Sequence, residues 1–134
     1  MKINDKIELL YIVKKTDLAN TLAITSQDEF PEVFATSKMI GLMEIAAARL
    51  MKASLAKNEL SVGVCVNVTH FAPTPNDEKV RVVATYKGME GRSFKFEVEL
   101  YDNGGKVAKG THTRAIVEAK RIEQVATKRV VAKQ

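Results

Sequence analysis

The 134-residue sequence contains one cysteine, two histidines, three prolines and no tryptophan. One cysteine, Cys65, cannot close an internal disulfide, which excludes a disulfide-stapled secreted domain and favours a reducing, cytoplasmic location. No run of 18 apolar residues occurs, and the charged start MKINDKIELL does not resemble a signal peptide, so we expect no membrane span. With so few histidines and cysteines, we expect no metal site. The sequence has no glycine-rich nucleotide-binding motif, so we expect no cofactor.

The net charge of +5 is concentrated at the C-terminus. Residues 120–134 carry five basic residues and one acidic residue, so residues 1–119 are nearly neutral. We therefore expect a folded body over 1–119 and a basic helix or tail over 120–134. A solvated tail is the simpler interpretation, and a tail that binds a polyanion is the alternative. The five Phe and three Tyr residues are not interleaved with a basic patch, which argues against nucleic-acid binding.

Hydrophobic alternation predicts a largely antiparallel sheet. Strands are expected over residues 5–14, 62–70, 79–86, 94–100 and 106–118, with hairpin turns at 88–91 and 102–105. The valines at positions 62, 64, 66 and 68 are predicted to share one strand face with His70, and Cys65 to lie on the other.

The strongest helix is predicted from Thr36 to about Lys57, with Thr36 or Ser37 as the N-cap residue. Residues 39–48 leave no polar face except at Glu44, so this helix should be buried on all sides. One apolar helix against one face of a curved antiparallel sheet is an α+β layer architecture, the hotdog arrangement. Because one small sheet cannot hide so apolar a helix, we expect a homodimer that also covers an edge strand.

Three polar residues are candidates for chemistry. Glu44 has no cationic residue three or four positions away, so its carboxylate needs a tertiary partner or a raised pKa. His70 ends an apolar strand face, and a Glu44–His70 pair would activate a hydroxyl or water. Thr36 is the candidate hydroxyl, beside a helix N-terminus that suits an oxyanion. The alternatives are a buried strut for Glu44, a satisfied core residue for His70 and plain N-capping for Thr36.

Two geometric points complete the candidate site. Thr36 and Glu44 lie eight residues apart, about 12 Å along an ideal helix, so either two subunits form the site or a substrate spans the gap. His112 and Arg114 share one face of the last predicted strand, where Arg114 could bind a phosphate or carboxylate.

Five short segments together resemble the fluoroacetyl-CoA thioesterase family over roughly residues 29–118: FPEVFAT at 30–36, GLME at 41–44, VTH at 68–70, APTP at 72–75 and GTHxR at 110–114. The resemblance implies a dimeric, metal-free hotdog acyl-CoA thioesterase whose catalytic set is Thr36, Glu44 and His70. It also implies that Gly63 lies close to the thioester and that Arg114 supports the site or contacts the ligand. Phe30 falls in the segment that forms the family's lid over the acyl group.

One position departs from this resemblance. The fluoroacetyl-selective type has a further aromatic residue in the lid, where this chain has Gln27. The expected activity is therefore hydrolysis of a short-chain acyl-CoA, with the acyl group and a covalent intermediate left open. A non-catalytic acyl-CoA-binding hotdog module is the alternative, whereas no separate motif points to a hydratase.

Overall fold

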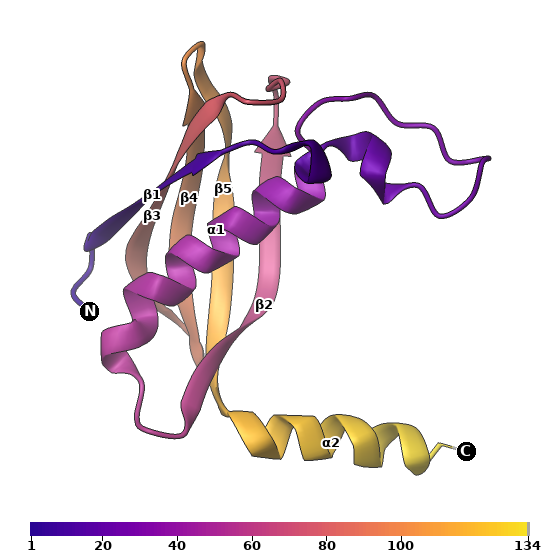
Figure 1. Ribbon diagram of the computed structural model, residues 1–134. Coiled ribbons are helices and arrows are strands. Elements are labelled where there is room, and N and C mark those ends of the chain that lie inside the picture. Colours follow the sequence, from indigo (N-terminus) through magenta and orange to yellow (C-terminus); the bar gives the residue numbers. More distant parts are fainter. Residues whose placement is uncertain (134) are drawn as a thin grey trace.

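The computed structural model describes residues 1–133 and shows a five-stranded antiparallel sheet crossed by one long helix (Figure 1). The strands are β1 (Lys6–Ile12), β2 (Glu59–His70), β3 (Lys79–Glu90), β4 (Ser93–Asp102) and β5 (Gly105–Glu118). The helices are α1 (Thr36–Met51) and α2 (Ala119–Val131), with short 3-10 turns at Lys15–Asp17, Ala19–Leu22 and Lys52–Ser54. The strand order is β1-β3-β4-β5-β2, and all neighbours are antiparallel. The predicted α+β layer architecture is confirmed.

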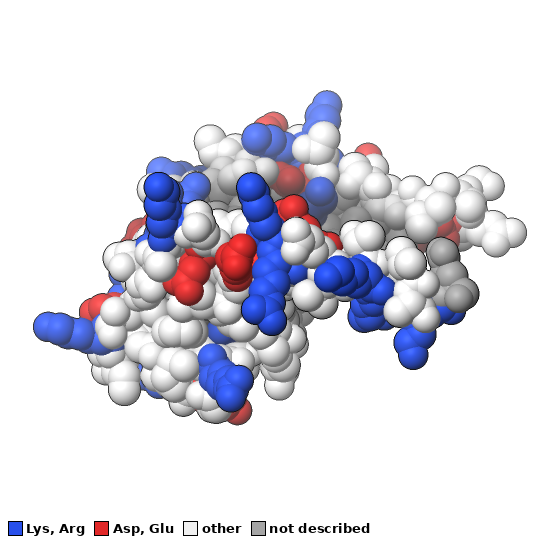
Figure 2. Space-filling view, turned by 90° about the horizontal axis from the view of Figure 1, so that it is seen from below, with Lys and Arg blue, Asp and Glu red and all other residues white. Residues whose placement is uncertain are grey.

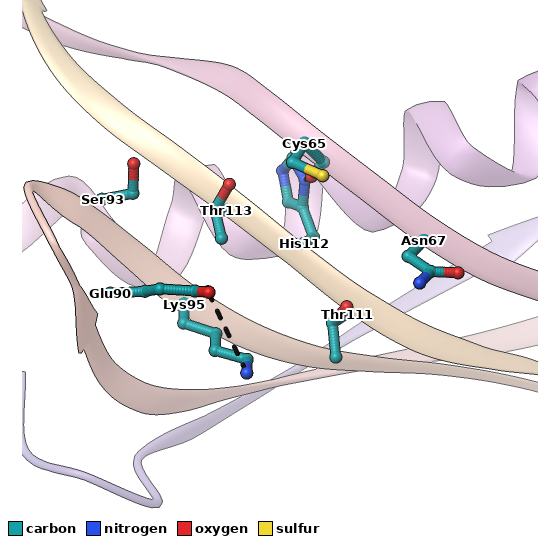
Figure 3. A pocket seen from close by; sticks show the side chains of 8 residues that line it. All are labelled: Cys65, Asn67, Glu90, Ser93, Lys95, Thr111, His112 and Thr113. Carbon is teal, nitrogen blue, oxygen red and sulfur yellow. Dashed lines mark hydrogen bonds and ion pairs between the residues drawn. The ribbon is translucent and has the colours of Figure 1, made fainter.

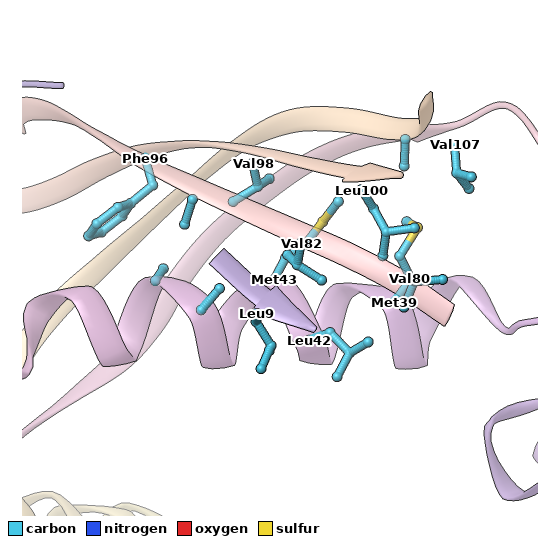
Figure 4. Packing of buried hydrophobic residues seen from close by; sticks show 14 of the residues in the cluster. Leu9, Met39, Leu42, Met43, Val80, Val82, Phe96, Val98, Leu100 and Val107 are labelled. Carbon is cyan, nitrogen blue, oxygen red and sulfur yellow. The ribbon is translucent and has the colours of Figure 1, made fainter. Parts of the chain in front are cut away.

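The core lies between α1 and the sheet face that it crosses (Figure 4). Alternation along β3 and β4 turns every second side chain toward the helix, which buries Val80, Val82, Ala84, Phe96, Val98 and Leu100. The helix contributes fully buried Met39, Met43 and Met51. Burial of one such large side chain contributes about 1.5–3 kcal/mol, so this layer fixes α1 firmly on the sheet.

The helix is shorter than predicted at its C-terminal end. The expected span reaches Lys57, but α1 ends at Met51 and continues as the 3-10 turn Lys52–Ser54. Leu55 then adopts extended backbone, with φ −94° and ψ 140°. Apolar periodicity alone does not distinguish a last helical turn from a tighter 3-10 turn, because both keep the half-buried Leu55 against the body.

One stripe of α1 stays accessible, contrary to the prediction of a helix buried on all sides. Ile45 is 44% exposed and the Glu44 side chain 41% exposed, while Ile40, Gly41 and Ala48 are half-buried. The sheet covers only the side of α1 that carries the three buried methionines. The chain therefore leaves an apolar strip with one carboxylate beside the edge strand.

The edge strand β2 differs from the predicted alternation, because a bulge interrupts its pairing with β5 between Gly63 and Cys65. Gly63 pairs with Arg114, whereas Val66 pairs with His112, so Val64 is the extra residue and is 58% exposed. The prediction that the four alternating valines share one face with His70 is thus wrong for the first two. Before the bulge, Ser61 and Gly63 are the residues of β2 that face α1.

The basic C-terminal segment is helical but hardly contacts the body. Helix α2 leaves the end of β5 and extends away from the sheet, and none of its residues is buried (Figure 1). Viewed from below, its surface carries several of the blue Lys and Arg side chains (Figure 2). The last residue of the predicted 120–134 tail, Gln134, lies outside the described residues. Within residues 1–133, neither α1 nor α2 has the length and apolar character needed to cross a bilayer.

Candidate active site

Thr36 and His70 form a hydrogen-bonded pair at the start of α1. Thr36 Oγ1 lies 2.8 Å from His70 Nδ1, which joins the first residue of the helix to the last residue of β2. The predicted N-cap role is wrong for Thr36 and Ser37, because Ala35 occupies the N-cap position and no side chain caps the helix. The hydroxyl is instead directed at an imidazole, which is the arrangement of a nucleophile and its base.

The second ring nitrogen of His70 has a different environment. His70 Nε2 is buried and has no hydrogen-bond partner within the described part of the chain. When Nδ1 accepts the Thr36 hydroxyl proton, Nε2 carries the ring N–H. The imidazole of His70 is therefore oriented by one hydrogen bond, from the Thr36 hydroxyl to Nδ1.

Glu44 pairs with Arg114 rather than with His70. The Glu44 Oε1 to Arg114 Nη1 distance is 3.1 Å, and this ion pair joins α1 to β5. The expectation of a tertiary partner for Glu44 is confirmed, while a Glu44–His70 pair is not formed within residues 1–133. Two separate clusters result, one at Thr36 and His70 and the other at Glu44 and Arg114.

Arg114 is almost fully buried and is held by several hydrogen bonds. Its Nε donates to Ser61 Oγ and its Nη2 to the Ser61 carbonyl oxygen, both at 2.9 Å. Its Nη1 lies 3.1 Å from both Glu44 Oε1 and His112 Nε2. With a side chain only 7% exposed and these contacts in place, Arg114 is suited to supporting Glu44 rather than to reaching a phosphate in solvent.

His112, which the sequence marked only weakly, is a central part of this network. It is 1% exposed, and its Nδ1 lies 2.9 Å from the Cys65 carbonyl oxygen. Because arginine can only donate, His112 Nε2 accepts from Arg114, so Nδ1 carries the proton and donates to Cys65. Burial lowers the pKa of His112, with the positive charge of Arg114 acting in the same direction and the Cys65 carbonyl opposing it. The ring is thus kept neutral.

This lowered pKa predicts a stability change in mildly acidic solution. Unfolded His112 takes up a proton as the pH falls through its ordinary pKa of 6.5, whereas the folded ring does so only at lower pH. The free energy of unfolding should be highest above pH 6.5 and fall below it, by at most about 1.4 kcal/mol per pH unit. Denaturant unfolding between pH 5 and 7 measures this slope.

The variant for that measurement is His112→Asn, which is expected to flatten the slope. The carboxyl pKa values of Asp28 and Glu99 are also lowered, but they change the free energy of unfolding only below about pH 4.5, outside the measured range of pH 5 to 7. An unchanged slope in His112→Asn would show that other groups cause the pH dependence.

Because Gly63 has no side chain, the Glu44 carboxylate can lie directly against the backbone of β2 at this position. A Cβ added at Gly63 would collide with Glu44 Oε1 and lie 3.3 Å from His112 Cε1. The bulge in β2 turns Gly63 toward α1, so the carboxylate rests directly on its backbone. The structure therefore places Gly63 beside the predicted catalytic carboxylate.

Gly63→Ala is expected to lower kcat by about 10–100-fold, because a displacement of a catalytic group by about 1 Å can cost 100-fold. Gly104→Ala is the matched control, since its added Cβ would meet only the Asp102 carboxylate in a distant hairpin. Steady-state kinetics and thermal unfolding of both variants measure the effect. Unchanged activity in a folded Gly63→Ala protein would mean that the position of Glu44 does not matter.

Phe30 lies in the loop that projects from the body between the second 3-10 turn and α1 (Figure 1). Its side chain is 47% exposed. Gln27 lies in the same loop and is exposed. The lid role of Phe30 remains a prediction.

A shallow pocket of about 280 Å³ occupies the sheet face opposite α1 (Figure 3). Cys65, Thr111 and Thr113 line it, and an ion pair between Glu90 and Lys95 spans 4.0 Å beside it. None of the three predicted catalytic residues lines this pocket. Among residues 1–133, no group of three or more His, Cys, Asp or Glu side chains is arranged to hold a metal ion.

Ser61 is the site residue that sequence reasoning missed. It lies two residues before Gly63 on β2 and provides two acceptors to Arg114. Nothing in its sequence context marks it, because a serine in a strand is common and its partner lies 53 positions away.

Comparisons with known proteins agree with this geometry. The sequence profile of a family described as fluoroacetyl-CoA-specific thioesterase matches residues 13–120. The fluoroacetyl-CoA thioesterase of Streptantibioticus cattleyicolor is 44% identical over 89 residues, which cover 66% of this chain and 64% of that protein. The matched region thus spans slightly less than two thirds of this curated relative.

Solved structures extend the likeness to the whole body. A mutant of the fluoroacetyl-CoA-specific thioesterase FlK, crystallised with fluoroacetate and CoA, matches with a TM-score of 0.86 at 33% identity. This match covers 91% of the present chain and 99% of that chain. A hot-dog-like protein from Thermanaerovibrio acidaminovorans matches with a TM-score of 0.80 at 20% identity, over 95% and 91% of the two chains. The predicted hotdog arrangement is confirmed.

Proposed function

Since the chain belongs to the fluoroacetyl-CoA-specific thioesterase family, we propose that it hydrolyses short-chain acyl-CoA thioesters. Thr36, His70 and Glu44 are the proposed catalytic residues. The observation that carries the proposal is the 2.8 Å contact between Thr36 Oγ1 and His70 Nδ1 at the N-terminus of a long helix. A hydroxyl, a base and a positive helix end are the parts that acyl transfer requires.

In the proposed mechanism, Thr36 or a water attacks the thioester carbonyl carbon while His70 accepts the proton. The N-terminal amides of α1 stabilise the negative charge that develops on the carbonyl oxygen. The carbon–sulfur bond then breaks, and the CoA thiolate takes the proton from the imidazolium. If Thr36 is the nucleophile, a water activated by His70 releases the acid from the acyl-enzyme. No metal or cofactor is needed at any step.

We propose further that two copies of the chain form a homodimer through the β2 edge. Within residues 1–133, β2 pairs with β5 alone, so the backbone groups on its other side lack sheet partners there. Val64 within this strand is 58% exposed, and the accessible stripe of α1, with Ile45 44% exposed, lies along the same edge. An antiparallel pairing of two β2 strands would cover both surfaces with a two-fold axis.

The dimer would also bring the two clusters together. Glu44 is 41% exposed and bonds Arg114 through Oε1 alone, which leaves Oε2 available from the side of a second chain. Thr36 is exposed as well. We therefore propose that Thr36 and His70 of one chain act on the same substrate as Glu44 of the other.

Complementation between two inactive variants tests this shared site. Glu44→Ala and His70→Ala homodimers should each be nearly inactive. Mixed heterodimers contain one intact site, so unfolding and refolding an equal mixture should restore about a quarter of wild-type activity, because half of the dimers are mixed. No restoration despite heterodimer formation, checked with two affinity tags, would place all three residues of each site in one chain.

A thiol-release assay tests the activity itself. Acetyl-, propionyl-, butyryl- and fluoroacetyl-CoA form the panel, because the acyl preference follows from lid residues that include Phe30 and Gln27. Release of CoA that is lost in both Glu44→Ala and His70→Ala supports the proposal. Saturable binding of the esters without thiol release would favour a non-catalytic acyl-CoA-binding module, and activity surviving in both variants would remove the residue assignment.

The state of the single cysteine bears on the cellular location. Cys65 is a free, exposed thiol, which suits a reducing compartment, so we propose a cytoplasmic location. Residues 1–119 form the proposed catalytic body, and residues 120–134 are an appended basic segment. We propose no role for nucleic acid or membrane in this activity.

A further inference from the structure

Two segments of the chain, α2 and the loop of residues 23–32, project beyond the β2 edge of the sheet in the same direction (Figure 1). They start from opposite ends of β2. The loop lies just before Thr36, which contacts His70, the last residue of β2. Helix α2 follows Glu118, which pairs with Glu59, the first residue of β2.

The two segments carry opposite charges. Loop 23–32 contains three acidic residues and no basic one, namely Asp28, Glu29 and Glu32. Helix α2 and the two residues after it contain five basic residues and one acidic residue. None of these charged side chains forms an ion pair within residues 1–133. Each segment therefore presents a charged surface that suits the other.

Both segments also expose apolar side chains. Ile24 in the loop is 90% exposed, which is unusual for an isoleucine that serves only a single chain. On α2, Ile122, Val125 and Val130 lie at positions i, i+3 and i+8, so they form one stripe along the helix. Val125 and Val130 are each about half exposed. An apolar stripe of this kind on a helix that extends away from the body indicates a contact with another surface.

The two segments of one chain lie too far apart to meet. The 12 residues of β2 separate their bases by about 36 Å, at 3.3 Å per residue. Helix α2 has 13 residues, so it is only about 20 Å long, and it extends away from the sheet rather than along β2 (Figure 1). A contact between α2 and loop 23–32 therefore requires a second chain.

The proposed β2-edge dimer provides that second chain in the right orientation. Antiparallel pairing of two β2 strands about a two-fold axis near their middle places the first residue of one strand beside the last residue of the other. Both segments cross this edge, so α2 of one chain extends toward the loop of its partner. We propose that α2 of each chain packs on loop 23–32 of the other, which contributes a second surface to the dimer. The inference rests on the homodimer in the proposed function.

Helical spacing identifies the charges that belong to this contact. Arg121 lies four residues before Val125, and Arg129 lies seven residues after Ile122, so both border the apolar stripe. At 100° per residue, Lys120 and Lys128 lie on the other side of the helix. The contact would hold the loop that leads into the partner's Thr36, so it would also position that end of the proposed active site.

Cross-linking between two differently tagged chains tests the contact directly. Both chains carry Cys65→Ser, one carries Ser26→Cys in the loop, and the other carries Val125→Cys in the apolar stripe. We expect a short bis-maleimide to join them into a covalent heterodimer. The matched control replaces Val125→Cys by Thr127→Cys, on the other side of α2, and should give far less product. Equal yields from the two pairs, or no product from a verified heterodimer, would overturn the proposal.

Charge reversal provides a second test, in which the rate of subunit exchange between tagged dimers is measured. Arg121→Glu, Arg129→Glu should raise this rate about tenfold or more, because modest effects of exposed charges add over two equivalent contacts. Adding Glu29→Arg, Glu32→Arg to that variant should restore slow exchange. Lys120→Glu, Lys128→Glu is the control with the same change in net charge. Equal acceleration in the control, or no restoration by the combined reversal, would contradict the contact.

The remaining outcomes separate this inference from the proposed function and from other occupants of α2. The cross-link without any thiol release would leave the contact standing and remove the catalytic proposal. A protein that sediments as a monomer yet hydrolyses thioesters would do the reverse. Binding to phosphatidylglycerol vesicles that both charge-reversal variants lose, with exchange rates unchanged, would assign α2 to an anionic lipid surface and overturn the inference.

Discussion

Replacing His70 with alanine is expected to lower kcat for acyl-CoA hydrolysis by about 10²–10⁴-fold, the usual contribution of general acid–base catalysis. His70 is the only base hydrogen-bonded to the Thr36 hydroxyl among residues 1–133, at 2.8 Å. KM should change little, because the imidazole acts on the reacting atoms rather than on the CoA part. Initial rates of thiol release over a range of substrate concentrations separate the two parameters.

Two substitutions at Thr36 complete this measurement. Thr36→Ser keeps the hydroxyl and should retain most activity, whereas Thr36→Ala separates the two proposed nucleophiles. Full activity in Thr36→Ala would show that water attacks directly, as would a single-turnover experiment without a covalent acyl adduct. A wild-type kcat in a folded His70→Ala protein would mean that another group moves the proton.

The two clusters of the site have different physical characters. Thr36 and His70 meet at the surface, where a helix begins and an edge strand ends. Glu44 accepts a hydrogen bond from Arg114, which in turn contacts His112, and these two residues are buried, at 6% and 1% exposed. Buried, satisfied hydrogen bonds fix the position of a group more firmly than exposed ones do. The carboxylate is therefore pre-positioned, and the nucleophile and its base lie where a substrate can enter.

Local periodicity was sufficient to predict most of the fold. The alternation of Val80 with Val82 and of Phe96 with Val98 identified both the strands and their buried faces. The turn at 102–105 was predicted from the Asn103-Gly104 pair, and Asp102 does pair with Gly105 across it. The positive φ, 121°, falls on Gly105 rather than on that pair. These features depend on neighbours within a few residues, so the sequence displays them directly.

The edge strand and the site could not be predicted in the same way. The bulge after Gly63 reverses which side chains of β2 face the helix. A glycine inside a strand is the one local signal of a bulge, but the valines on both sides of Gly63 predict an uninterrupted alternation. The partner of Glu44 lies 70 residues away in sequence, and only the packing of α1 against β5 brings the two together. Residue chemistry and the family resemblance both pointed to Thr36, Glu44 and His70, and helix spacing already separated Thr36 from Glu44. Only the tertiary structure shows that His70 contacts Thr36 while Glu44 pairs with Arg114.

Strands β5 and β2 leave no room for a side chain at Gly110, and alanine there is expected to have a large effect on stability. A Cβ at Gly110 would collide with the Asn67 carbonyl oxygen and lie 2.6 Å from Val68 Cα, both backbone atoms of β2. Backbone in the middle of a ladder cannot rotate away as a side chain can. Overpacking usually costs about 1–3 kcal/mol and occasionally more, and we expect Gly110→Ala to lie at or above the top of that range.

Gly110→Ala should also disturb the contact between Thr36 and His70. Gly110 pairs with Val68, two residues before His70, so forcing β5 away from β2 would shift the imidazole that faces Thr36. Denaturant unfolding of Gly110→Ala measures the loss of stability, and Gly104→Ala in the adjoining hairpin provides the control with little expected change. Limited proteolysis of the soluble fraction of Gly110→Ala gives a second readout for the case in which the variant does not unfold reversibly, and we expect early cleavage in β2. A stability within about 0.5 kcal/mol of the wild type, the range of ordinary surface substitutions, would mean that β2 and β5 are not held at this separation in solution.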